Sequence, residues 1–264
     1  KDGFVVHVQE GEEPPAPAGR FYRAEGKYLL PGLIDSHVHI ESSMLTPENF
    51  CRATLPFGTT TVVTDPHEIA NVFGAEGVRY MHAGGEGLPQ RQYIDIPSCV
   101  PAVPGLEGSG AVLGPQDVHQ LAELERVIGL AEVMDYIGVV DGEPRMMEMI
   151  AAAEEEGLYI QGHLPMGRGR TISAYAIGGP KTCHESSGRE EAREKLRAGM
   201  WVDLRYSSIV NNIPELYEAI REMPYLDRVS FCTDDREVDD ILRRGHLVDV
   251  LRCAIGRGMD PVAA

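Results

Sequence analysis

The sequence PGLIDSHVHIESS (residues 31–43) begins as an apolar strand and ends in polar residues at alternate positions. His37, His39 and Glu41 follow one another at a spacing of two. Side chains two residues apart on a strand point to the same side. The stretch therefore predicts a strand with two imidazoles on one face near its carboxyl end, a geometry that can hold a metal ion.

Apolar runs that stop at polar residues recur along the chain. The other strand-like runs occupy residues 59–65, 93–103, 127–135, 158–163, 181–185, 200–205 and 228–235. Segments with apolar residues three and four apart separate them and are typical of helices, for example 115–129, 144–157, 189–199 and 213–223. About eight strand–helix units predict a parallel sheet closed as a (β/α)8 barrel. An open doubly wound sheet is the alternative, but no GxGxxG follows a first strand.

The first thirty residues have a different character. Strand-like pieces at 4–8 and 20–30 flank the proline-rich stretch EEPPAPAG (residues 12–19). Such pieces are too few to close a sheet alone. We therefore expect residues 1–30 to be a small N-terminal β appendage to a barrel domain at residues 31–264.

Composition limits the partners of the chain. The formal net charge of −17 over 264 residues argues against a nucleic-acid backbone or an anionic membrane as the main partner. Five widely spaced cysteines without a CxxC pair fit a reducing cytoplasm better than a disulfide framework. No apolar run approaches the roughly 20 residues that cross a bilayer. These features leave a small molecule as the expected partner and the cytoplasm as the expected location.

Further polar residues end the later strand-like runs. Because catalytic groups of a barrel gather at the carboxyl ends of its strands, we expect these side chains to meet at one rim. Imidazoles and carboxylates in this number form a ligand set for two divalent cations. A polar rim without metal is the alternative for any one residue. The predicted ligands are His37, His39, Glu132, His163, His184 and Asp234.

The motifs of the chain resemble those of the adenine deaminase family within the amidohydrolase superfamily. The resemblance runs from about Leu30 to the last residue. HxH alone marks only the superfamily, whereas DPHEIANV and the glutamate of the fourth strand are more specific. The motifs are PGLIDSHVHIESSMLTP (31–47), TDPHEIANVFG (64–74), GLAEVMD (129–135), GHLP (162–165), CHESS (183–187) and CTDD (232–235).

The resemblance implies that residues 1–30 are a partial N-terminal β-sandwich segment, and it implies a binuclear metal centre and a hydrolytic reaction. His37, His39 and Asp234 would hold one ion, and His163 and His184 the other, with Glu132 bridging. Manganese, iron and zinc suit such ligands about equally. A hydroxide bound to the two metals would attack C6 of adenine, giving hypoxanthine and ammonia. Asp234 would carry the proton from the attacking water to the leaving amine.

The ring nitrogen of the base needs a second proton carrier. Candidates are His67 and Glu68 in DPHEIAN, Glu185 beside a ligand, and Glu41 of the opening stretch, which is also a candidate contact to the base. Arg205 and Ser207, at the end of the seventh strand, are further candidate base contacts. Rim packing or loop capping is the alternative for each of them.

Several positions depart from the pattern of the family. Cys183, Tyr206 and Glu237 stand where aspartate, glutamate and histidine are usual, and Ser207 and Val238 where glycine and proline are usual. The ligands are kept and the neighbours of the pocket are altered, so the substrate stays open. The alternatives are another purine, a cyclic amide of the hydantoinase or dihydroorotase type, or a catalytically inactive metal-binding relative. Self-association, common among relatives, is also open, as is whether the chain is part of a longer protein.

Overall fold

The computed structural model describes residues 5–11, 19–223 and 226–264. By internal contacts the chain divides into two compact units, Lys1–Pro31 and Gly32–Ala264. In the first unit, residues 5–11 and 19–31 form coil and turns. The strand expected over residues 20–30 is therefore wrong, because a strand needs a neighbour and these residues pair with none in the described chain. Residue 4 of the other expected piece lies outside the described residues, and the β-sandwich assignment stays a prediction.

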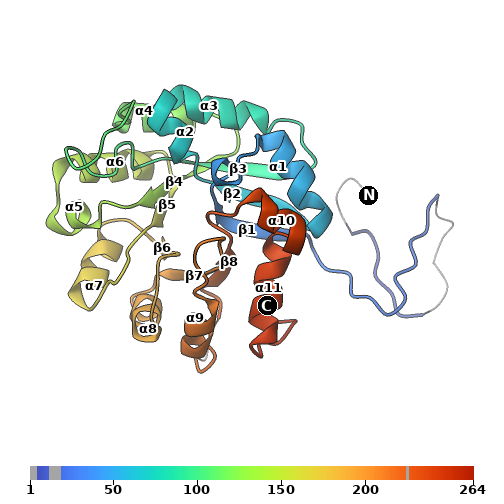
Figure 1. The fold of residues 1–264 in the computed structure, drawn as a ribbon. Helices are drawn as coiled ribbons and strands as arrows, with labels where there is room; N and C mark the ends of the chain where they lie inside the picture. Colours follow the sequence, from blue (N-terminus) through green and yellow to red (C-terminus); the bar gives the residue numbers. More distant parts are fainter. Residues whose placement is uncertain (1–4, 12–18, 224–225) are drawn as a thin grey trace. The chain divides into compact units, whose positions relative to one another are not determined.

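The second unit is a (β/α)8 barrel, as the sequence predicts. In its described residues eight strands run in chain order, and neighbouring strands pair in parallel as β1 to β5 and as β6 to β8. Figure 1 shows the helices outside these strands, following the chain from blue to red. The strand-like runs from residue 32 onwards are confirmed, except that the run at 93–103 is a strand only to Ile96, because Pro97 has no amide proton to continue the ladder. The strands are β1 (Leu33–Val38), β2 (Thr59–Thr64), β3 (Arg91–Ile96), β4 (Val127–Val133), β5 (Tyr159–Gly162), β6 (Thr182–Cys183), β7 (Trp201–Arg205) and β8 (Val229–Cys232).

Most helices begin where the sequence places a proline or a capping group. Thr46 caps the first helix by accepting a hydrogen bond from the Asn49 amide, and Pro47 is its first residue. The segment 115–129 is helical only to Ala122, because β4 takes over from Val127. The helices are α1 (Pro47–Thr54), α2 (His67–Phe73), α3 (Ala75–Gly84), α4 (Pro115–Ala122), α5 (Tyr136–Asp141), α6 (Pro144–Glu155), α7 (Arg170–Ile177), α8 (Arg189–Arg197), α9 (Ile213–Ile220), α10 (Val238–Arg244) and α11 (Leu247–Gly256), with 3-10 turns η1 (Glu41–Ser43) and η2 (Leu55–Phe57).

The buried apolar residues form two clusters. One joins β1 to β5 with the helices beside them and includes Val62 and Leu130. The other joins β7 and β8 with α9 and α11 and includes Leu204 and Leu216. Among the described residues no helix is both long and apolar enough to cross a bilayer. These clusters hold the strands in place, so that the carboxyl ends of the strands can carry polar side chains.

The two sheets meet at two seams. At the first, the Asp234 amide donates to the His37 carbonyl (3.0 Å) and the His39 amide to the Asp234 carbonyl (3.4 Å). At the second, the Lys181 amide donates to the Ile160 carbonyl (3.0 Å) beside β5. A Cβ on Gly162 would lie 2.3 Å from the Thr182 carbonyl oxygen, so only glycine allows this close approach.

A buried polar network lies behind the seam between β8 and β1. Asp35 accepts hydrogen bonds from the Thr233 amide (3.1 Å) and hydroxyl (2.6 Å). When Asp35 is ionised, the Thr233 hydroxyl donates to it, so the Nε2–H of His246 donates to that hydroxyl (3.1 Å). The Nδ1 atom of His246 then accepts from Thr59 (3.1 Å). Burial, with Arg236 nearby, lowers the pKa of His246 to about 3, so the ring is neutral at pH 7.

His246→Gln is expected to destabilise the fold most at pH 7 and less as the pH falls. The unfolded chain protonates this imidazole below about pH 6.5, whereas the folded chain does so only near pH 3. The contribution of His246 to the free energy of unfolding therefore falls by about 1.4 kcal/mol for each pH unit between 6.5 and 3. Urea unfolding of wild type and variant at pH 7 and pH 5 measures the difference.

Thr59→Val is the matched control, because it removes a hydrogen bond of the same imidazole without removing a titratable group. Its cost in the free energy of unfolding should change much less between these pH values. An equal cost of His246→Gln at pH 7 and pH 5 would contradict the neutral, buried imidazole.

Candidate metal centre

The structure brings the six predicted ligands together at the carboxyl ends of the strands. His37 lies in β1 and Glu132 in β4, His39, His163 and His184 directly follow β1, β5 and β6, and Asp234 is the second residue after β8. All except the half-buried His163 are buried. Candidate ligand atoms lie within 4.8 Å of one another in overlapping groups: His37, His39 and Asp234; His37, Glu132 and His184; His163, His184 and Glu185; and His39, Asp65, His67 and Glu132.

The imidazoles of His37 and His39 turn their Nε2 atoms toward each other. Gln161 donates its amide to the Ser36 carbonyl (2.9 Å), so its Oε1 accepts the Nδ1–H of His37 (2.7 Å). The Nδ1–H of His39 donates to the Asp65 carbonyl (2.9 Å). In the neutral rings both Nε2 atoms then carry lone pairs, and they lie 3.1 Å apart. Second partners of this kind orient imidazoles toward a metal ion.

The carboxylate of Asp234 completes the first group. Its Oδ1 lies 3.2 Å from His39 Nε2 and 3.5 Å from His37 Nε2. Two lone pairs and a carboxylate repel one another unless a proton or a cation lies between them. Burial opposes ionisation of Asp234, but contacts with His37 and His39 hold its pKa well below the ordinary range. The three side chains therefore form a site that requires positive charge.

Glu132 lies between the two groups of imidazoles. One oxygen is 3.5 Å from His39 Nε2, and the other is 2.5 Å from His163 Nδ1 and 3.1 Å from His184 Nε2. Burial would raise the pKa of Glu132, but His163 and His184 bring it well below the ordinary value. The position suits a carboxylate that bridges two ions.

Among the candidate ligands, His184 most clearly has a buried polar atom that needs a binding partner. Its Nε2 is buried and, although Glu132 Oε2 lies 3.1 Å away, the geometry gives it no hydrogen bond. Burial and the neighbouring His37 lower the pKa of His184, which favours the neutral ring with a free lone pair. A buried nitrogen that points into a group of carboxylates and imidazoles fits a metal ligand. The residues present therefore fit divalent metal ions.

Arg205 adds a positive charge beside this group. Its NH1 donates to Asp234 Oδ2 (2.6 Å) and also to Glu185. Glu185 Oε1 lies 3.9 Å from His184 Nε2. The predicted residues Arg205 and Glu185 thus reach the site, and the guanidinium keeps both carboxylates in place.

His67 reaches the same centre from the start of α2. Its Nδ1 lies 3.0 Å from Asp65 Oδ2 and 3.4 Å from Glu132 Oε1. Burial would lower the pKa of His67, but Asp65 raises it far above the ordinary value. In this structure His67 is thus an imidazolium held between two carboxylates.

Glu41 and Glu68 are a pair of carboxyl groups at the rim of the barrel. Ser42 lies within hydrogen-bonding distance of Glu68 (2.8 Å) and Asp235 (2.5 Å). Oε2 of both Glu41 and Glu68 is buried and makes no hydrogen bond, and that of Glu68 lies 3.8 Å from His39 Nδ1. Burial and the charge of Glu68 raise the pKa of Glu41 to about 8, so it carries a proton at neutral pH.

The structure gives Ser207 a local role. Its hydroxyl oxygen accepts hydrogen bonds from the amides of Ile209 (3.2 Å) and Val210 (2.9 Å), and it lies 3.3 Å from the Val210 carbonyl. Serine commonly closes turns in this way. In this structure the hydroxyl therefore caps the loop after β7, and its contact with the base stays a prediction.

Sequence reasoning missed two residues of the centre. Asp65 joins His39, His67 and Glu132 in one candidate ligand group, and Gln161 orients His37. Asp65 carries the same signal as the predicted ligands, since it follows the apolar run of β2 directly. Gln161 lies inside a strand and offers no such signal.

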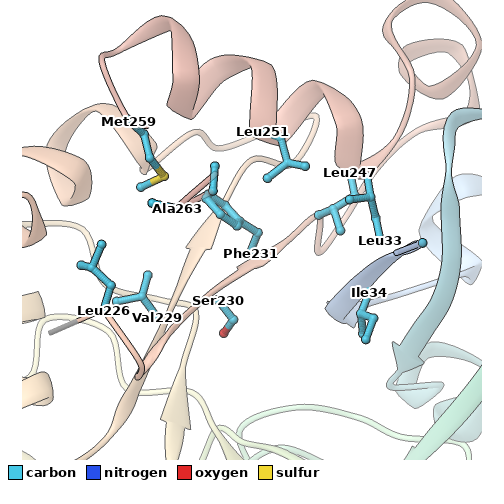
Figure 2. Close-up of a pocket in the computed structure, with 12 residues that line it drawn as sticks. Leu33, Ile34, Leu226, Val229, Ser230, Phe231, Leu247, Leu251, Met259 and Ala263 are labelled. Carbon is cyan, nitrogen blue, oxygen red and sulfur yellow. The ribbon is translucent and has the colours of Figure 1, made fainter. Parts of the chain in front are cut away.

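A separate cavity opens at the other ends of the strands. It has a volume of about 310 Å³ and is lined by the first residues of β1 and β8 and by α11. Figure 2 shows mainly apolar side chains there, among them Leu33, Phe231 and Met259. Its lining contains no histidine or carboxylate side chain, so it is not part of the metal centre.

Comparison with known proteins identifies the family. A model of the amidohydrolase family matches residues 28–259. The chain belongs to the amidohydrolase family. As in many barrels of this class, this amidohydrolase carries its polar cluster at the carboxyl ends of the strands.

Curated relatives match nearly the whole chain. It is 45% identical over 243 residues to adenine deaminase of Thermosipho africanus, covering 91% of this chain and 42% of that protein. It is 43% identical over 267 residues to adenine deaminase of Oleidesulfovibrio alaskensis, covering 100% of this chain and 45% of that protein. The resemblance predicted from the motifs is confirmed. The chain spans less than half the length of these curated relatives.

Solved structures confirm the fold. N-acetyl-D-glucosamine-6-phosphate deacetylase of Mycobacterium smegmatis aligns with a TM-score of 0.57 and 16% identity, covering 88% of this chain and 71% of that chain. The carboxyl transferase domain of Rhizobium etli pyruvate carboxylase aligns with a TM-score of 0.51 and 12% identity, covering 88% of this chain and 45% of that chain. At such identities the likeness concerns the fold alone.

Uptake of a divalent cation by this amidohydrolase should strengthen with pH. Burial would lower the pKa of His37, but Asp234 and Glu132 raise it to about 9. A metal must displace this proton, so the apparent affinity should rise about tenfold for each pH unit between 7 and 9 for each proton released. Competition with a chelating indicator at pH 7, 8 and 9 measures it. An affinity independent of pH would contradict the protonated imidazole.

Glu132→Gln should lower the metal content of the purified protein. An amide is neutral and cannot offer two equivalent anionic oxygens to the two groups of imidazoles. Elemental analysis after dialysis against Zn²⁺ measures the stoichiometry. Glu86→Gln, at an exposed position, is the control and should retain the content of the wild type. An unchanged stoichiometry in Glu132→Gln would exclude Glu132 as a ligand.

Proposed function

We propose that the chain forms the catalytic barrel of an adenine deaminase, which converts adenine and water into hypoxanthine and ammonia. The observation that carries the proposal is the meeting of four imidazoles with Glu132 and Asp234 at one mouth of the barrel. Relatives named adenine deaminase match this chain at 43–45% identity and supply the substrate.

Two divalent ions, manganese, iron or zinc, are the cofactors that we propose. His37, His39 and Asp234 would hold one ion, and His163 and His184 the other, with Glu132 between them. When bound, such ions lower the pKa of water toward neutrality and thereby supply a nucleophile.

Asp234 is the group that we assign to move the first proton. Contacts with His37, His39 and Arg205 keep its carboxylate ionised, so it can accept a proton from the attacking water. Arg205 holds the second oxygen and so fixes the direction in which the carboxylate faces. The same proton would pass to the amine that leaves C6 as ammonia.

The carboxyl pair Glu41 and Glu68 is the better candidate for the second proton carrier. His67 is held by Asp65 and Glu132, and Glu185 is held by Arg205. Glu41 and Glu68 each keep one buried oxygen that makes no hydrogen bond. A carboxyl group in this position can protonate a ring nitrogen of the base as its C6 becomes tetrahedral.

A small neutral purine base is the partner that we propose. The net charge of −17 disfavours nucleic acid and anionic membranes, which would be repelled. Self-association and a cytoplasmic location are further parts of the proposal, the latter drawn from the five free cysteines.

Asp234→Asn should reduce the release of ammonia from adenine by about 10² to 10⁴-fold, because an amide cannot accept the proton. The assay uses chain loaded with Mn²⁺, Fe²⁺ or Zn²⁺, measures hypoxanthine and ammonia, and records the metal content beside them. Asp239→Asn, an exposed carboxylate in α10, is the matched control and should keep wild-type turnover.

Full activity of Asp234→Asn would exclude Asp234 as the proton carrier. A metal-loaded wild type that leaves adenine unchanged would overturn the substrate assignment. Ring opening of a hydantoin or a dihydropyrimidine by that protein would identify the cyclic-amide alternative.

A further inference from the structure

The seam between β5 and β6 lies directly beneath two of the proposed metal ligands. The five-stranded sheet ends with β5, and the three-stranded sheet begins with β6. His163 follows β5 and His184 follows β6. The relative placement of these two imidazoles therefore depends on contacts other than a continuous strand ladder.

Side chains hold the backbone at the upper end of β5. The Gly162 amide donates to the Thr182 hydroxyl (3.2 Å), and the His163 amide to the Tyr175 hydroxyl (2.8 Å). The next amide, that of Leu164, lies 3.3 Å from the sulfur of Cys183. These contacts fix the backbone here, as hydrogen bonds between paired strands do elsewhere in the sheet.

Lys195 of α8 is fully buried at this seam. Its ammonium donates to the Leu164 carbonyl (2.5 Å) and the Glu191 carboxylate (2.7 Å), and it lies 3.1 Å from both Cys183 Sγ and the Ser186 hydroxyl. An ammonium has three protons to donate, and four groups lie within reach of this one. The contacts therefore fix its position.

The partners of Lys195 are neighbours of the two imidazoles. Leu164 follows His163 in the chain, and Cys183 precedes His184. One ammonium thus contacts the residue after His163 and the residue before His184. A buried ion pair gives little net stability compared with apolar residues of similar size, so its stronger effect is on geometry.

We propose that Lys195 is a positioning residue that sets the separation of His163 and His184 and thereby the affinity of the ion they hold. The inference rests on the metal centre of the proposed function. Without the ammonium, the Leu164 carbonyl and the Cys183 sulfur lose their common donor, and only the direct contacts between Gly162 and Thr182 and between Leu164 and Cys183 remain to hold the two imidazoles apart. The ion between His37, His39 and Asp234 uses other strands and should be unaffected.

The test compares Lys195→Met with the double variant Glu191→Gln/Lys195→Met in the full chain. Lys195→Met leaves the Glu191 charge buried and unpaired, which should lower the melting temperature of the metal-free protein. The double variant removes both charges and should recover most of that melting temperature. Arg197→Met, at an exposed position of the same helix, is the control.

Zn²⁺ titration with elemental analysis gives the deciding readout. In both variants one of two Zn²⁺ ions should bind about 10 to 100-fold more weakly, and the other should bind as in the wild type. Lys195→Gln keeps a donor within possible reach of the Leu164 carbonyl and should lose less affinity. Arg197→Met should bind both ions as the wild type does.

Two results would overturn the inference. If the double variant regains wild-type Zn²⁺ affinity together with its melting temperature, Lys195 serves stability alone. If Lys195→Met and Lys195→Gln bind both ions as tightly as the wild type, the ammonium does not set the imidazole spacing. A wild type that takes up no Zn²⁺, Mn²⁺ or Fe²⁺ would instead overturn the proposed function, and this inference with it.

Discussion

The structure depends on compensation of buried charge at the mouth of the barrel. Glu132 and Asp234 are almost fully buried, and each is surrounded by imidazole nitrogens rather than by water. Such carboxylates are tolerated only beside positive charge, which protons provide in the metal-free chain and cations would provide in the loaded one. The closing strands β8 and β1, the orienting Gln161 and the guanidinium of Arg205 all serve to keep these groups within contact distance.

Much of the fold and the six ligands could be predicted from sequence. Apolar runs that end in a histidine or a carboxylate show both the strand and the position of its carboxyl end. Parallel strands then bring those ends together whatever their separation in the chain. The same logic fails for residues 20–30, where a β-like composition has no partner strand in the described chain.

Supporting residues were beyond that reasoning for a different reason. Gln161 contacts His37 across 124 positions of the chain, and Lys195 contacts Leu164 across 31. From sequence alone, a glutamine or a lysine is expected at an exposed position. Only the tertiary structure shows which buried group each side chain contacts. The sequence hides the role of His246 for the same reason, since its partners Thr59 and Thr233 come from two different strand regions. The backbone amides that bind the Ser207 hydroxyl are likewise visible only in the folded loop.

Gly162 limits how this barrel can change over evolutionary time. Any side chain at this position would begin within 2.3 Å of a backbone oxygen, which cannot swing aside as a flexible side chain can. Even alanine would force the neighbouring strand outward and carry an imidazole with it. Substitutions in the loops around the mouth can therefore accumulate, whereas no residue with a β-carbon fits at position 162 unless the backbone shifts.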